Sequence, residues 1–104
     1  MAEALAVAEH SNLDLDALHN IISGHAMNSP LLQLCMSKMT SGNHSPPLFM
    51  LKHMHKDAVL AAELAASVGQ PSPITAATRD VYSTALEDFG GDNWTAVHSS
   101  MTKQ

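Results

Sequence analysis

The residues best suited to chemistry lie in one segment, from residue 46 to residue 61. Lys52 and Lys56 in this segment are two of the five basic residues in a chain of net charge −5. Residues four apart lie on the same face of a helix, so both lysines would share a face with Phe49 and His53. That face would form a positive and partly apolar site. The alternative is an ordinary solvated helix face, on which a pair of lysines is common.

The chain has seven histidines, which raises the question of a metal site. On a helix His53 and His55 point apart, because they are two residues apart, and no cysteine or acidic residue completes a ligand set at the usual spacing. We therefore expect no metal site. Asp57 lies four residues after His53 and could pair with it as an exposed carboxylate. His44 lies in a loop, and its place relative to this segment stays open.

Composition narrows the class of protein. The 104 residues suffice for one small domain, with one Trp, one Tyr and two Phe among mainly Ala, Leu and Met apolar residues. Few β-branched and aromatic residues favour helices over strands. The acidic balance argues against non-specific binding of nucleic acid, and no run approaches the roughly 20 apolar residues of a membrane span. The single cysteine, Cys35, excludes an internal disulfide and is expected in the core. We expect a protein of the cytoplasm or of an organelle matrix, both reducing compartments.

Capping residues divide the chain into about six helices. Asp14 is suited to cap a helix, Gly24 to end it, and Pro30 to occupy the first position of the next one. No stretch alternates with a period of two, so we expect no strands and an all-α bundle. The expected helices span residues 2–10, 15–23, 30–39, 48–68 and 73–89, and a short last helix contains Trp94 after a cap by Asp92 or Asn93.

Residues 48–68 are expected to form one long central helix. Its second half, from Ala58 to Val68, is apolar nearly all round, and only Glu63 and Ser67 interrupt it. A helix of this kind is usually buried on most sides. We therefore predict that it is the longest and most buried helix of the domain, and that its first turns carry the positive site.

Several short motifs occur in an order that resembles a known family. The longest is LKHxxKDxxLA over residues 51–61, which follows Phe49. The order is similar to that in the C-terminal helical domain of the β-hydroxyacid dehydrogenases, the group that contains 3-hydroxyisobutyrate dehydrogenase. Within this group, LKHxxKD most resembles the glyoxylate/succinic semialdehyde reductases, and the resemblance covers essentially all 104 residues. The shorter motifs are Ala2-Glu3-Ala4, Asn12-Leu13-Asp14, Ser29-Pro30, Gly42-Asn43, Pro71-Ser72-Pro73, Val81-Tyr82, Gly91-Asp92-Asn93 and Ala96-Val97.

The resemblance implies a helical domain of the 6-phosphogluconate dehydrogenase C-terminal type over residues 1–104. In that family a Rossmann domain comes first, and a long helix that leads into the C-terminal domain carries the catalytic lysine. The chain has no Gly-rich dinucleotide loop and no lysine before Lys38. We therefore expect it to be the second half of such an enzyme and to be inactive alone. It would share NAD or NADP with the Rossmann domain, where the residue that distinguishes the two cofactors lies.

The resemblance also implies the ligands and the assembly. The intact enzyme would act on a small oxo or hydroxy acid. The spacing, charge and hydropathy arguments above add the expectation of no metal and of no nucleic acid or membrane as a partner. The chain would supply one wall of the cofactor and substrate cleft and contacts for a homo-oligomer.

Three residues correspond to positions with a role in the family. Lys56 matches the lysine that faces the nicotinamide cofactor, and an ammonium group beside an apolar surface favours phosphates and carboxylates. Asp57 matches an aspartate that would orient Lys56 or the catalytic lysine. Phe49 matches an aromatic residue that would cover the nicotinamide or a short substrate, although such a residue is more often part of a core.

A second function is also consistent with the sequence. The same domain could be a non-catalytic helical module for oligomerisation or interaction. A G-x-G-x-x-G strand–helix unit and a lysine-bearing helix encoded upstream would favour the enzyme, and their absence would favour the module. A three-helix module that binds nucleic acid ranks third, because the five basic residues form no stripe.

Overall fold

The computed structural model describes residues 1–103 and is all-helical over that range. The one strand-like contact among these residues is an isolated antiparallel bridge between Met50 and Asn93. The expected all-α fold is therefore confirmed. The elements are α1 (Ala2–His10), α2 (Leu15–Ser23), α3 (Pro30–Ser41), α4 (Leu51–Ser67), α5 (Pro73–Phe89), the short 3-10 helix η1 (Trp94–Ala96) and α6 (Val97–Thr102).

Side-chain caps set the start of α2, where the sequence predicts Asp14 as the cap, and the start of α3. Asp14 Oδ1 accepts hydrogen bonds from the backbone N–H groups of Asp16 at 3.0 Å and Ala17 at 3.1 Å. Ser29 Oγ accepts one from the N–H of Leu32 at 3.0 Å. Such caps satisfy N–H groups that have no partner within the helix.

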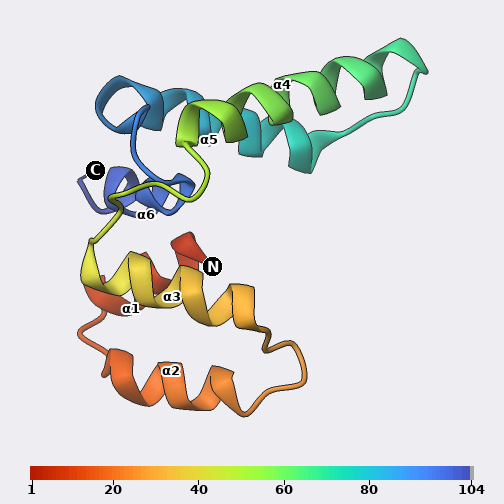
Figure 1. The fold of residues 1–104 in the computed structure, drawn as a ribbon. Helices are drawn as coiled ribbons and strands as arrows, with labels where there is room; N and C mark the ends of the chain where they lie inside the picture. The colour runs from red at the N-terminus through yellow and green to blue at the C-terminus, as the bar shows by residue number, and fades with distance from the viewer. Residues whose placement is uncertain (104) are drawn as a thin grey trace.

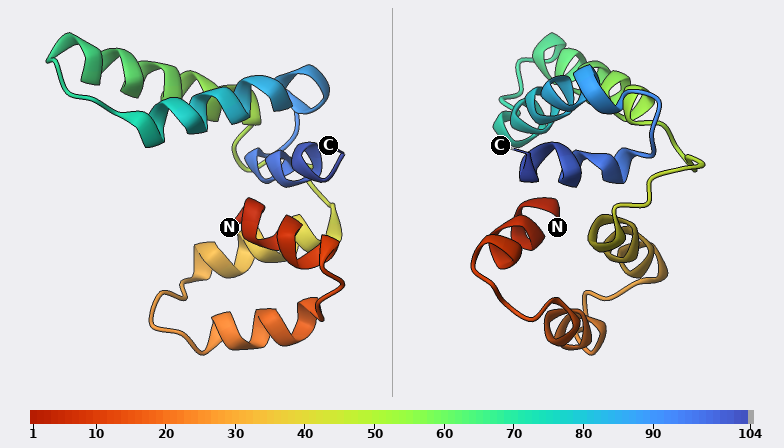
Figure 2. Two further views of the ribbon diagram at one scale, coloured as in Figure 1. Left: turned by 180° about the vertical axis from the view of Figure 1, so that it is seen from behind. Right: turned by 90° about the vertical axis from the view of Figure 1, so that its left-hand side faces the viewer.

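The helices form two groups with α6 between them (Figure 1). At one end lie α1, α2 and α3, and at the other end α4 and α5 form an antiparallel hairpin. The view from behind shows the hairpin projecting well beyond α6 (Figure 2). The domain is elongated as a result, with principal extents of 43 × 30 × 25 Å. The buried core lies where the two groups meet and consists of Ala2, Leu5, Met39, Leu51, Ala85, Ala96 and Val97.

α4 is neither the central helix nor the most buried one, so that prediction is wrong. Within α4 only Leu51 is buried, whereas Leu60 and Leu64 are 52% and 68% exposed. α5 has the same length, 17 residues. The all-round apolar pattern indicates burial on several sides. Among residues 1–103, however, only α5 packs along the far half of α4. The central position belongs to η1 and α6, which between them contact α1, α3, α4 and α5.

Asp14→Ala should lower the free energy of unfolding by about 0.5–2 kcal/mol, because two N–H groups at the start of α2 lose their acceptor. Urea unfolding followed by circular dichroism measures this change. Asp14→Asn is the matched control, since its amide oxygen can accept the same hydrogen bonds, and it should remain close to the wild type. Equal losses in both variants would show that the negative charge, and not the cap, stabilises α2.

Candidate functional site

The start of α4 forms an exposed surface that we call the lysine face, made of Phe49, Lys52, His53, Lys56 and Asp57. All five residues are exposed. The rings of Phe49 and His53 lie against each other, with centroids 5.7 Å apart and planes tilted by 51°. Phe49 is 38% exposed, so part of its ring is open to solvent. The structure therefore places an open aromatic ring at the start of the helix that carries both lysines.

No ion pair neutralises the lysines of this face. Three ion pairs occur among residues 1–103, and none of them involves Lys52, Lys56 or Asp57. The sequence allows an ion pair between Asp57 and His53, but the structure of residues 1–103 does not contain it. The two ammonium groups are thus available to an anion from solvent.

The turn after α5 holds the backbone at the start of α4. The N–H of Leu51 donates to the carbonyl of Asp92 at 2.8 Å, and the N–H of Lys52 donates to that of Gly90 at 3.1 Å. The next two N–H groups donate to the carbonyl of Met50. Free N–H groups are what make a helix N-terminus a phosphate site, and α4 has none in its first turn. The positive charge of the lysine face therefore comes from its side chains.

Asn93 is a fully buried residue that links the loop before α4 to η1. Its Oδ1 accepts hydrogen bonds from the N–H groups of Leu48 at 2.9 Å and Phe49 at 3.1 Å. Its Nδ2 donates to Thr95 Oγ1 at 2.9 Å, and its backbone N–H donates to the carbonyl of His44 at 2.9 Å. The sequence indicates Asn93 only as a possible cap. Its partners Leu48 and Phe49 lie 45 and 44 residues away, so no local pattern reveals the link.

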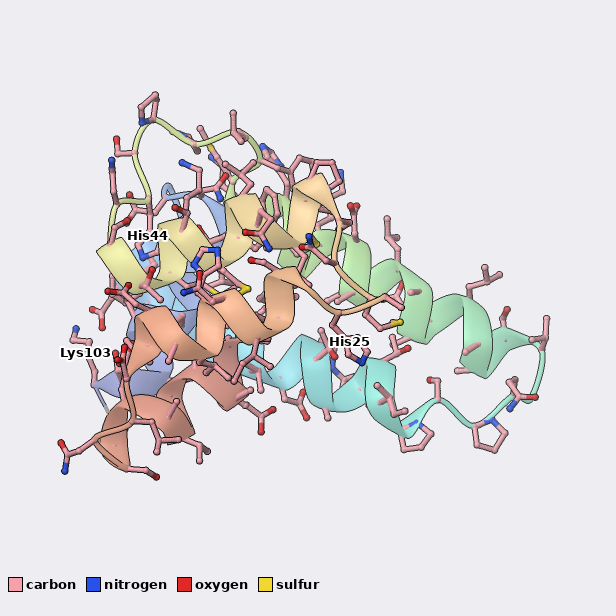
Figure 3. All side chains as sticks on the ribbon, turned by 90° about the horizontal axis from the view of Figure 1, so that it is seen from below. His25, His44 and Lys103 are labelled. Atoms are coloured by element: carbon pink, nitrogen blue, oxygen red, sulfur yellow. The ribbon has the colours of Figure 1, made fainter. Side chains whose placement is uncertain are left out.

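His44, labelled in Figure 3, is buried and belongs to the same network, not to the lysine face. Its Nδ1 lies 2.9 Å from Thr95 Oγ1, and its Nε2 lies 2.9 Å from Ser99 Oγ in α6. Burial is the main cause that lowers the pKa of His44, and the nearby Asp92 carboxylate partly opposes it. The ring is therefore neutral in the folded domain near pH 7.

A second buried histidine, His98, connects α6 to α1. Its Nε2 lies 2.9 Å from Glu9 Oε1, and its Nδ1 lies 3.2 Å from the carbonyl oxygen of Ala2. A carbonyl only accepts hydrogen bonds, so Nδ1 is the donor in its contact with Ala2. The sequence gives no signal for this contact, because 89 and 96 residues separate the partners.

A groove of about 580 Å³ lies between α1, α3, α5 and α6, and no residue of the lysine face lines it. Its lining is mainly apolar and includes Cys35 and Tyr82. Burial raises the pKa of the Cys35 thiol, and it also raises that of the Tyr82 hydroxyl. Cys35 packs against the buried core. A protonated thiol in apolar surroundings is a packing group and not a nucleophile.

Among residues 1–103, no three His, Cys, Asp or Glu side chains come together as a metal site requires. None of the helices in this range combines the length and the apolar character needed to cross a membrane.

The fold is that of the helical domain of a dehydrogenase. The structure of 3-hydroxyisobutyrate dehydrogenase from Salmonella typhimurium matches it with a TM-score of 0.85 at 24% identity, over 94% of this chain and 34% of that one. Residues 1–101 match the family described as NAD-binding of NADP-dependent 3-hydroxyisobutyrate dehydrogenase. The chain belongs to this family, as the motif order indicates.

Three relatives illustrate the range of the family. Glyoxylate/succinic semialdehyde reductase 2, chloroplastic, of Arabidopsis thaliana is 37% identical over 84 residues, 81% of this chain and 23% of the relative. Cytokine-like nuclear factor N-PAC of Aedes aegypti is 34% identical over 99 residues, 94% of this chain and 18% of the relative. The 3-sulfolactaldehyde reductase of Escherichia coli K12 is 35% identical over 98 residues, 92% of this chain and 33% of the relative. The chain therefore spans a third or less of each of these proteins.

The domain should lose stability as the pH falls below about 6.5, the ordinary pKa of histidine. The pKa of His44 is lower in the folded domain than in the unfolded chain. As the pH falls below the unfolded pKa, the unfolded chain therefore binds more protons than the folded domain, and this stabilises the unfolded chain. Urea unfolding at pH 7.5 and at pH 5.5 measures the loss. His44→Gln should show a smaller loss than the wild type.

His25→Gln is the control for this experiment, because His25 is exposed in the loop between α2 and α3 (Figure 3). It should retain the full loss of stability on acidification. An identical pH dependence in His44→Gln and the wild type would contradict the prediction.

Proposed function

We propose that this chain forms the helical wall of the cofactor and substrate cleft in an NAD(P)-dependent β-hydroxyacid dehydrogenase or reductase. The observation that supports it most directly is the lysine face, where two exposed lysines without an ion-pair partner among residues 1–103 follow an open aromatic ring. In this proposal Lys56 binds the cofactor, and Phe49 covers the nicotinamide or a short substrate. Asp57 makes no ion pair with Lys56 among residues 1–103, so in this proposal it orients the catalytic lysine of the Rossmann half.

The residues of the lysine face fit the chemistry of these ligands. NAD(P) carries phosphates, and a small oxo or hydroxy acid carries a carboxylate, so ammonium groups attract both. The Phe49 ring offers a flat apolar surface to a nicotinamide ring. The cofactor supplies the hydride chemistry when it is bound, while this chain binds and orients. The lysine that serves as acid or base in the family comes from outside this domain, so the chain alone supplies binding without turnover.

Lys56→Ala should raise the KM for cofactor or substrate about ten- to a hundred-fold in a two-domain protein with a Rossmann domain and its lysine helix upstream. A charge-assisted contact is worth roughly 1.5–3 kcal/mol, which gives this range. Steady-state kinetics measure the change, and the free energy of unfolding should barely move, since Lys56 is exposed.

Lys52→Ala is the matched control, because Lys52 lies one turn earlier on the same helix, and it should have the smaller effect. If Lys56→Ala unfolds the domain or leaves the kinetics unchanged, Lys56 is not a ligand-binding residue.

We also propose that the domain self-associates through the α4–α5 hairpin. Leu60, Leu64, Val68 and Ile74 are 52%, 68%, 72% and 82% exposed along it, and many side chains of the hairpin extend away from the rest of the domain (Figure 3). Apolar side chains gathered on one exposed element indicate a protein–protein contact. A second copy of the chain, with the same hairpin, would cover them symmetrically.

The purified chain should be a dimer or a larger species at micromolar concentration, as measured by light scattering. Leu64→Asp should shift it toward the monomer, because a carboxylate buried without a partner is costly. Leu13→Asp is the matched control, since Leu13 is 58% exposed but lies in the turn between α1 and α2, and this variant should associate like the wild type. A monomeric wild type would contradict the proposal.

A non-catalytic interaction module is the second candidate, and the similarity to N-PAC supports it. That relative is named a nuclear factor, whereas the Arabidopsis and Escherichia coli relatives are named reductases. Such a module would still associate through the hairpin. It would bind no cofactor whose affinity a substitution of Lys56 could change. The kinetic experiment with Lys56→Ala therefore separates the two functions, because association is expected of both.

A further inference from the structure

We propose that Asn93 is a positioning residue for the lysine face. Its side-chain oxygen sets the place of Phe49 and of the loop that leads into α4, and so where the aromatic ring of the lysine face lies relative to the lysines. The consequence for ligand binding rests on the proposed function. The positioning itself rests on the buried hydrogen bonds of Asn93.

The N–H groups of Leu48 and Phe49 depend on Asn93 alone. Asn93 Oδ1 is their acceptor at 2.9 Å and 3.1 Å, and neither group makes another hydrogen bond among residues 1–103. Removal of this oxygen would leave two neighbouring donors without a protein partner. N–H donors without a protein acceptor form hydrogen bonds with water instead, so the segment that carries them would move.

Side-chain packing does not hold this segment by itself. Leu48 is 65% exposed and Phe49 is 38% exposed, whereas Leu51 at the start of α4 is 0% exposed. The carbonyl of Phe49 accepts a hydrogen bond from the N–H of Trp94 at 2.9 Å. Polar contacts from residues 93–94, more than burial, therefore set the place of the Phe49 ring.

A second layer of contacts keeps the Asn93 amide in one orientation. Its Nδ2 donates to Thr95 Oγ1, and a flipped amide would turn the NH₂ group toward two backbone donors. Thr95 Oγ1 in turn contacts His44, which reaches Ser99 in α6. Among residues 1–103 no buried side-chain polar atom lacks a partner. A fully satisfied buried network of this kind is rigid, as a positioning element must be.

Two substitutions separate positioning from a general effect on stability. Asn93→Ala removes the acceptor, whereas Asn93→Asp keeps an acceptor oxygen and removes the Nδ2 donor. The contact between the Phe49 and His53 rings, whose centroids lie 5.7 Å apart, is measured by nuclear Overhauser effects without any ligand. We expect Asn93→Ala to lose these effects and to shift the amide signal of Leu48, while core signals such as that of Ala85 stay in place. Asn93→Asp should keep the ring contact.

Titration of the 104-residue chain with NADPH gives the functional readout, through the amide signals of Phe49, Lys52 and Lys56. We expect binding about ten-fold weaker in Asn93→Ala, because a ligand must then order the face on binding. Asn93→Asp should bind within about two-fold of the wild type, since the positioning oxygen is retained. A wild type without any NADPH-induced shift would count against the proposed function alone, because the ring contact is measured without ligand.

Unchanged ring contacts in a folded Asn93→Ala variant would overturn the proposal. Equal damage in the Ala and Asp variants would overturn it as well, since that result means a general loss of stability. Should Asn93→Ala fail to fold, Asn93→Asp decides: a retained Phe49–His53 contact in a less stable domain supports positioning by the oxygen, and a displaced Phe49 ring refutes it.

Discussion

Two backbone N–H groups in the loop before α4, those of Leu48 and Phe49, find their acceptor in one side chain from the other end of the chain. The Asn93 amide is fully buried and must be paired, and this requirement ties the loop to η1. Leu51, fully buried beside it, adds the apolar half of the same junction. The carbonyls of Asp92 and Gly90 complete the junction, because they accept hydrogen bonds from the N–H groups of Leu51 and Lys52. The start of α4, and with it the lysine face, follows from this junction.

The distribution of charge over the chain favours the lysine face as the place where an anion binds. The chain has ten acidic and five basic residues, so its overall field repels anions. Arg79 and Lys103 are each engaged with an aspartate, whereas Lys52 and Lys56 have no ion-pair partner within residues 1–103. Lys38 in α3 is likewise outside these ion pairs but stands alone, whereas Lys52 and Lys56 lie together, so an approaching phosphate or carboxylate meets two ammonium groups at the start of α4. Exposed lysines cost little stability, so the fold tolerates them there.

The sequence predicts those parts of the fold that depend on neighbouring residues. The bounds of α1 and α2 agree with expectation, because the cap at Asp14 acts within three residues of itself. That Lys52 and Lys56 share one face of a helix also follows from their spacing. The start of α4 and the place of His44 do not, because their partners lie more than 40 residues away. Pairing across such a distance leaves no periodic pattern that a single sequence could reveal.

The apolar sequence of the second half of α4 explains both why the hairpin exposes apolar side chains and why the sequence wrongly predicts a buried helix. From residue 58 to residue 68 the sequence is apolar nearly all round, which calls for contacts on more than one side. Within residues 1–103 α5 supplies one of those sides, and Leu60 and Leu64 remain open. An α-helix of 17 residues is a rigid rod of roughly 25 Å. In the proposed assembly α4 carries the ligand site on its first turns and the contact between copies on its last. Because one rod bears both, a contact that fixes the far end of α4 also restricts the lysine face, so association and ligand binding share one element of the fold.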